Sequence, residues 1–99
     1  MKLEKFLDVA MDDNDIIAIG TESGSGFTYI GKAGDRELIT KAFINASNFP
    51  RTNVLDREIV KAYRKEVDSC VAIIIKGTET NMVWTKEEFD KKYKKMLAH

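Results

Sequence analysis

The chain has 99 residues, 43% of them hydrophobic and 32% charged, a balance typical of one soluble globular domain and not of a disordered chain. Its 16 basic and 16 acidic side chains cancel, so the overall charge is not that of a dedicated nucleic-acid-binding protein. No apolar run approaches the roughly 18 residues needed to cross a membrane, and the N-terminal residues do not resemble a signal peptide. We therefore expect a cytoplasmic protein with no membrane association.

The first half of the chain predicts a helix, a hairpin and a second helix. Apolar residues at helical spacing over Leu3–Met11 predict an amphipathic helix, which stops at the turn-forming residues 12–14. Ile16–Ile19 and Phe27–Ile30 predict two strands joined through a glycine- and serine-rich connection, which favours a hairpin. Asp35 is placed as the N-cap of a second helix, whose apolar side would consist of Leu38, Ile39, Ala42, Phe43 and Ala46.

The segment 55–67 fits two structures. Its apolar residues have good helical spacing, but Arg57–Lys65 read as a strand would pair with the next segment through a turn at 67–69. That next segment, Cys70–Ile75, is apolar on both faces and predicts a central strand. The helix-or-strand choice at 55–67 stays open on spacing alone.

The end of the chain predicts a short edge strand and a well-marked helix. Met82–Trp84 favours the strand, and the Thr85–Glu88 pair forms a capping box for the helix. Trp84 and Phe89 would form its hydrophobic staple. Residues 1–99 therefore predict a single α+β domain, with a small, mainly antiparallel sheet of about four strands and N-terminal, middle and C-terminal helices.

Four segments carry a resemblance to a group of proteins. Leu3–Asp13 runs into a strand, Leu55–Val60 reads L-D-R-E-I-V, and Ile73–Gly77 and Trp84–Glu88 follow. These segments resemble small, mostly uncharacterised proteins encoded by phages and prophages of Gram-positive bacteria. The resemblance implies a phage or prophage setting and a strand over 57–65, and it identifies no functional residue.

Most side chains of recognisable catalytic sites are scarce in this sequence. The only histidine is His99 and the only cysteine, Cys70, opens an apolar run, which predicts a buried thiol. They cannot supply a Cys/His metal set, a Ser-His-Asp triad or a Cys-His pair. We therefore expect no enzyme activity and no cofactor. Acid–base catalysis would need a cleft that joins two carboxylates from among Glu37, Asp56, Glu58 and Glu66.

Two ligand motifs are present only in degraded form. Residues 26–33 match the phosphate-loop pattern G-x-x-x-x-G-K but end in Ala33, which lacks the hydroxyl for Mg²⁺, and their β-forming residues favour a hairpin strand. Asp12, Asp13 and Asp15 resemble the opening of a calcium loop without its glycine and glutamate positions. A solvated turn is the better interpretation of the three aspartates.

Two binding functions remain. We favour a non-enzymatic accessory protein, phage- or prophage-derived, that binds another protein or itself, since aromatic residues such as Tyr29, Phe49 and Trp84 lie outside the helical stripes and leave room for an exposed patch. The alternative is a nucleic-acid-binding module. If 57–65 is a strand, its alternation places four residues on one basic and aromatic face: Arg57, Lys61, Tyr63 and Lys65.

Overall fold

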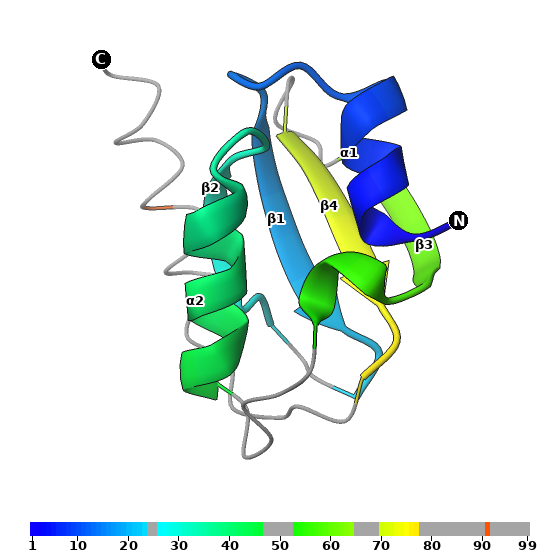
Figure 1. The fold of residues 1–99 in the computed structure, drawn as a ribbon, viewed down its shortest axis with the longest axis vertical. Helices are drawn as coiled ribbons and strands as arrows, with labels where there is room; N and C mark the ends of the chain where they lie inside the picture. The colour runs from blue at the N-terminus through cyan, green and yellow to red at the C-terminus, as the bar shows by residue number, and fades with distance from the viewer. Residues whose placement is uncertain (24–25, 47–52, 65–69, 78–90, 92–99) are drawn as a thin grey trace.

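The computed structural model describes residues 1–23, 26–46, 53–64, 70–77 and 91, without the side chains of residues 44–46. The predicted C-terminal helix, its capping box and the strand at 82–84 lie outside the described residues. The described part confirms the α+β class. Its elements, in chain order (Figure 1), are α1 (Leu3–Ala10), β1 (Ile16–Thr21), β2 (Tyr29–Lys32), α2 (Arg36–Ala46), the short 3-10 helix η1 (Val54–Asp56), β3 (Ile59–Arg64) and β4 (Cys70–Ile75).

The four strands form one sheet in the order β2-β1-β4-β3. The β1–β2 and β3–β4 pairings are antiparallel, so the predicted hairpin is confirmed, and so is the strand interpretation of 57–65 over Ile59–Arg64. The central pairing of β1 with β4 is parallel, with Ile16 beside Cys70. The sheet is therefore mixed and not purely antiparallel, and its two antiparallel pairings out of three agree with the predicted, mainly antiparallel arrangement. Parallel strands are normally buried on both faces, and the apolar sequences of β1 and β4 meet that requirement.

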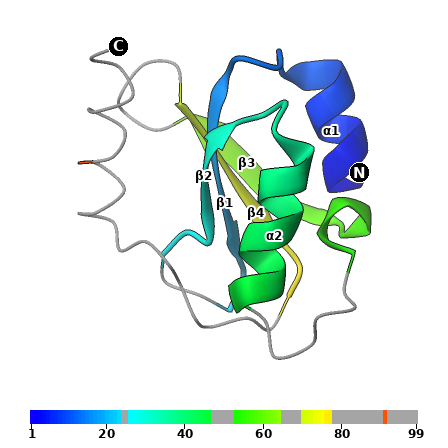
Figure 2. The same ribbon diagram turned by 60° about the vertical axis from the view of Figure 1, so that its left-hand side comes forward.

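The main core lies between the sheet and the helices. Both α-helices and η1 cover the same face of the sheet (Figures 1 and 2). Alternate residues of the central strands point to this face, because side chains along a strand alternate between its two sides. The fully buried residues that meet there are Leu3 and Leu7 of α1, Ile17 and Ile19 of β1, Ile39 and Phe43 of α2, Val54 of η1, and Ile73 and Ile75 of β4.

The opposite face of the sheet carries a second apolar cluster. Its buried members come from β1, β2, β4 and the segment before β2: Ala18, Phe27, Ile30, Cys70 and Ala72. Cys70 is fully buried, as its apolar neighbours predicted. Ile74 is only partly buried on this face. The candidate site lies beside Ile74, where the second cluster approaches β3.

The two helices largely follow their predicted patterns. The amide of Ile39 donates to the carbonyl of Asp35 (3.0 Å), which places Asp35 at the N-cap position of α2. Ile39 and Phe43 are buried, but Leu38 is 53% exposed, so its place in the predicted apolar side is wrong. Leu38 precedes Ile39 by about 100° of helical rotation, which moves it to the margin of the buried stripe.

The two degraded ligand motifs have ordinary structural roles. Residues Tyr29–Lys32 form β2 and pair with β1, so the glycine-lysine segment is a strand and not a phosphate-binding loop. In the aspartate segment, the amide of Asp12 donates to the Asp15 carboxylate (2.8 Å) and the amide of Asp15 donates to the Asp12 carbonyl (3.0 Å). The predicted turn is confirmed. In the described part of the chain, no helix is long and apolar enough to cross a membrane.

Candidate functional site

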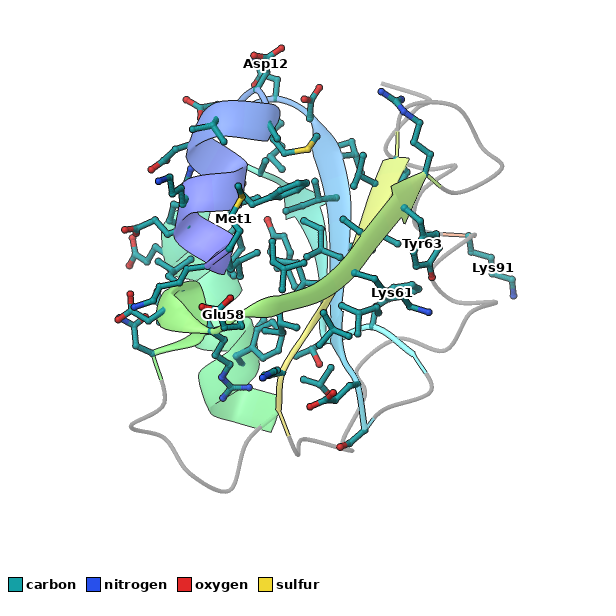
Figure 3. All side chains as sticks on the ribbon, turned by 90° about the vertical axis from the view of Figure 1, so that its right-hand side faces the viewer. Met1, Asp12, Glu58, Lys61, Tyr63 and Lys91 are labelled. Atoms are coloured by element: carbon teal, nitrogen blue, oxygen red, sulfur yellow. The ribbon has the colours of Figure 1, made fainter. Side chains whose placement is uncertain are left out.

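The most exposed strand of the sheet is β3. The sequence Ile59-Val-Lys-Ala-Tyr-Arg64 combines β-branched and aromatic residues with two basic ones, a composition that suits an edge strand. Among the described strands, β3 is at one end of the order and pairs with β4 alone. Ile59 is half-buried and all five side chains after it are exposed. Figure 3 looks onto this edge of the sheet.

An irregularity at the start of β3 decides which side chains share a face. Ile59 pairs with Ile75, and in a regular ladder Val60 would pair with Ile74, but Lys61 takes that place. Val60 is therefore the extra residue of a bulge, in which two residues of β3 oppose one of β4. Ile75 faces the helices and Ile74 faces the opposite side. Arg57 and Ile59, two residues apart before the bulge, therefore lie on the helix-covered face, and Lys61 and Tyr63 lie on the other.

The bulge separates Arg57 from the other predicted nucleic-acid contacts. The Arg57 guanidinium lies 5.9 Å from the centroid of the Phe43 ring on α2, and its Nη1 donates to the carbonyl of Lys76 (3.5 Å). Phe43 belongs to the core beneath the helices. The prediction that Arg57 shares a face with Lys61 and Tyr63 is therefore wrong, because strict alternation fails at the bulge. Lys65 lies outside the described residues.

Lys61 and Tyr63 do come together. The Lys61 Nζ lies 5.5 Å from the centroid of the Tyr63 ring, within the range of a cation–π contact. Tyr63 is 43% exposed, so part of its ring is open to solvent. Figure 3 shows both side chains directed to the same side of the sheet, away from α1. The pair presents an aromatic surface beside a positive charge.

A pocket of about 400 Å³ lies next to this pair. It crosses the partly buried Ile74 of β4 and reaches the end of β1, so its lining mixes apolar and polar side chains. We call it the β3 pocket, and its lining residues are Thr21, Glu22, Gly26, Phe27, Val60, Lys61, Tyr63 and Ile74.

A close backbone approach shapes the far wall of the β3 pocket. A Cβ atom at Gly20 would lie 2.6 Å from the carbonyl oxygen of Gly26. Only glycine at position 20 therefore lets the chain at Gly26 and Phe27 pass this close to β1. The amide of Glu22 donates to the carbonyl of Ile75 (3.1 Å), which holds the end of β1 against β4.

The first residues of the chain occupy the start of the β3 edge. Lys2 forms an antiparallel bridge with Glu58, the amide of Leu3 donates to the carbonyl of Arg57 (2.9 Å), and the amide of Ile59 donates to the carbonyl of Met1 (2.9 Å). The carbonyl of Glu58 accepts from the amide of Lys76 on the other side (3.0 Å). Backbone groups of successive residues thus point alternately toward the β4 side and toward the outer edge.

The described candidate carboxylates are exposed, and each contacts a different partner. Glu37 forms an ion pair with Lys41 of the same helix (3.3 Å), and the Asp56 carboxylate accepts from the Asn53 side chain (2.9 Å). Glu58 accepts from the Met1 ammonium (2.9 Å), and this hydrogen bond, with the charge of the ammonium, lowers the pKa of Glu58. The structure does not bring these three groups into one cleft. Glu66 lies outside the described residues.

Sequence reasoning misplaced some exposed side chains and missed others. Tyr29 is only 6% exposed, so it does not contribute to an exposed patch, whereas Val60 is 45% exposed. Phe49 and Trp84 lie outside the described residues. The sequence does contain one signal for the bulge at Val60, the adjacent apolar pair Ile59-Val60. Two neighbouring apolar residues in an edge strand interrupt the alternation of buried and exposed side chains.

Comparisons of the chain with protein-family models, with curated proteins and with solved structures find no match.

Proposed function

We propose that this chain is a non-enzymatic accessory protein that binds another protein through the β3 edge. The observation that carries the proposal is the exposure of Val60 and Tyr63 around the β3 pocket. An exposed aromatic side chain beside a concave surface that mixes apolar and polar groups is a common feature of protein-binding surfaces. The resemblance to phage and prophage proteins supports a role in a Gram-positive bacterial cytoplasm.

The test is affinity capture from a nuclease-treated Gram-positive lysate with three forms of the chain. The native chain should retain a stoichiometric protein partner, and the double variant Val60→Ala/Tyr63→Ala should lose it, because truncation removes both apolar anchors. Val9→Ala is the matched control, since Val9 is an exposed valine, 67% accessible, on α1. A partner retained equally by all three forms would exclude β3 as the binding surface.

Self-association is the second possible outcome of this proposal. Sedimentation velocity of the purified chain distinguishes it from binding to another protein. A stable dimer that dissociates in the Val60→Ala/Tyr63→Ala variant would make a second copy the partner. A monomer that captures no protein through this surface would overturn the proposed function.

One specific observation favours a second candidate, a nucleic-acid-binding module. The Lys61–Tyr63 contact offers an aromatic ring for base stacking and a charge for phosphate, and Figure 3 shows Lys91 on the side to which they point. This module predicts oligonucleotide affinity that falls steeply with salt and weakens in Lys61→Ala and Tyr63→Ala. Lys5→Ala, an exposed lysine on α1, is the control. Absence of binding at low salt would exclude it.

A further inference from the structure

The outer edge of β3 is already used as a template by the chain itself. Residues Met1–Leu3 pair with residues 57–59 in the antiparallel sense, and the two hydrogen bonds that join them are both 2.9 Å long. This pairing stops at Ile59, while β3 continues to Arg64. An edge strand presents outward N–H and C=O groups at alternate residues, so the rest of β3 offers the same template.

We propose that residues 60–64 bind a partner protein by accepting an extended segment of it as an additional antiparallel strand. This inference rests on the proposed protein-binding function and names the chemistry of the partner. In strand addition, main-chain hydrogen bonds supply affinity and pockets for alternate side chains supply specificity. The β3 pocket lies at the correct place for the second requirement, since Val60, Lys61 and Tyr63 line it.

The charges of β3 define the partner. Lys61 and Arg64 are exposed, and their pairing with Ile74 and Val71 puts them on opposite faces of the strand. β3 itself contains no acidic residue. Acidic side chains opposite these two residues would be attracted, and basic ones would be repelled. The added strand should therefore carry two acidic residues three positions apart.

Tyr63 determines which residue should follow the first of the two acidic residues in the added strand. Tyr63 pairs with Ala72 and shares the pocket face with Lys61, so the residue opposite Tyr63 lies on the face of the sheet that carries the β3 pocket, beside the Tyr63 ring. An antiparallel partner runs in the opposite direction to β3. Four successive residues of the partner therefore lie opposite Arg64, Tyr63, Ala62 and Lys61, in that order. The preferred segment is therefore acidic, apolar, any residue, acidic.

The same charges disfavour a second copy of the chain on this edge. In the antiparallel register that pairs all of residues 61–64 with their copies, Lys61 would lie opposite Arg64 of the other chain. Like charges directly opposite one another destabilise a strand pair. An acidic segment of a different protein is thus favoured over β3 itself, which gives the edge specificity by repulsion as well as by attraction.

The experiment uses short capped peptides as probes and backbone NMR of the intact chain as readout. A peptide centred on Glu-Val-Thr-Glu should shift the amide signals of residues 60–64 and slow their hydrogen exchange. The matched peptide centred on Lys-Val-Thr-Lys should bind roughly tenfold more weakly, because two cross-strand pairs change from attractive to repulsive. The double variant Lys61→Glu/Arg64→Glu should reverse this preference.

Backbone methylation of the acidic peptide separates strand addition from side-chain docking. Only every second amide of an added strand points toward β3. Methylating one alternate set of peptide amides should abolish binding, and methylating the other set should leave it intact. Equal binding by both methylated peptides would overturn strand addition, and so would the absence of binding by any peptide.

The capture and peptide experiments together distinguish an error in the strand-addition inference from an error in the proposed function. If no peptide binds but a partner is still captured through Val60 and Tyr63, the protein-binding function stands and the strand-addition mode is wrong. If the capture also fails, the function itself is wrong. An oligothymidylate that shifts the side-chain signals of Lys61 and Tyr63 without protecting amides 60–64 would support the nucleic-acid module and overturn the inference.

Discussion

At the scale of single residues, Gly31 shows how a small residue accommodates a neighbouring ring. The Tyr29 hydroxyl donates to the carbonyl of Lys32 (2.8 Å), which carries the ring across position 31. A Cβ atom at Gly31 would lie 2.5 Å from the Tyr29 Oη and 2.8 Å from its Cζ. The ring is buried and hydrogen-bonded, so it cannot move aside without losing contacts.

We therefore expect Gly31→Ala to lower the free energy of unfolding by about 1–3 kcal/mol, the usual range for overpacking. The neighbouring exposed residue supplies the control, since Lys32→Ala keeps the backbone carbonyl and should change stability by no more than about 0.5 kcal/mol. Urea unfolding followed by circular dichroism measures both values. Equal stability of the two variants would show that the ring moves freely.

At the scale of secondary-structure elements, α1 stabilises the fold through one face only. Leu7 is 1% exposed, whereas Val9 is 67% exposed on the same helix. Leu7→Ala should lower the free energy of unfolding by about 2–5 kcal/mol, because it leaves a cavity between α1 and the sheet. Val9→Ala should leave stability unchanged or slightly raised, since alanine favours helices more than valine does. Similar losses in both variants, measured by chemical denaturation, would contradict this packing.

The predicted elements and the observed ones differ where the structure depends on distant contacts. Leu3–Ala10 and Cys70–Ile75 were predictable, because the spacing of apolar residues is a local property of the sequence. The parallel pairing of β1 with β4 was not, since nothing local to either strand specifies its neighbour. The bulge at Val60 was not predicted either, and it moved Arg57 out of the candidate site.

The candidate site was therefore only partly predictable. The composition of β3 indicated a basic and aromatic surface, and Lys61 and Tyr63 do form one. The β3 pocket could not be predicted, because its lining joins β1, the segment before β2, β3 and β4. Its far wall depends on the approach of Gly26 to Gly20, a contact that only the folded chain reveals.

At the scale of the whole molecule, the burial of Tyr29 makes stability depend on pH. Burial of the phenol and then the negative charge of Asp35 raise the pKa of Tyr29 to about 12, from 10.0. Well below pH 10 the phenol is neutral in both states, so it causes no pH dependence there. Between pH 10 and about 12 the unfolded chain loses this proton while the folded chain keeps it, so the free energy of unfolding falls as pH rises.

The expected loss across this interval is about 2–3 kcal/mol. Tyr29→Phe should not show this loss of stability. In an ultraviolet absorbance titration, the native chain should show a last tyrosine ionisation at high pH, and Tyr29→Phe should not show it. Urea unfolding of both forms at several alkaline pH values measures the difference. Parallel pH profiles for the native chain and Tyr29→Phe would show that the phenol ionises alike in the folded and unfolded states.

The parallel central pair also has a consequence for synthesis on the ribosome. β1 is made early, yet its partner β4 follows only after β2, α2, η1 and β3. Until β4 leaves the exit tunnel, one long edge of β1 has no β4 beside it, and the core residues of both helices lack the β4 side chains that they contact in the finished fold. A nascent chain that stops before Cys70 therefore exposes apolar surface of the kind that chaperones bind. The sheet can therefore be completed only after Cys70–Ile75 have been synthesised.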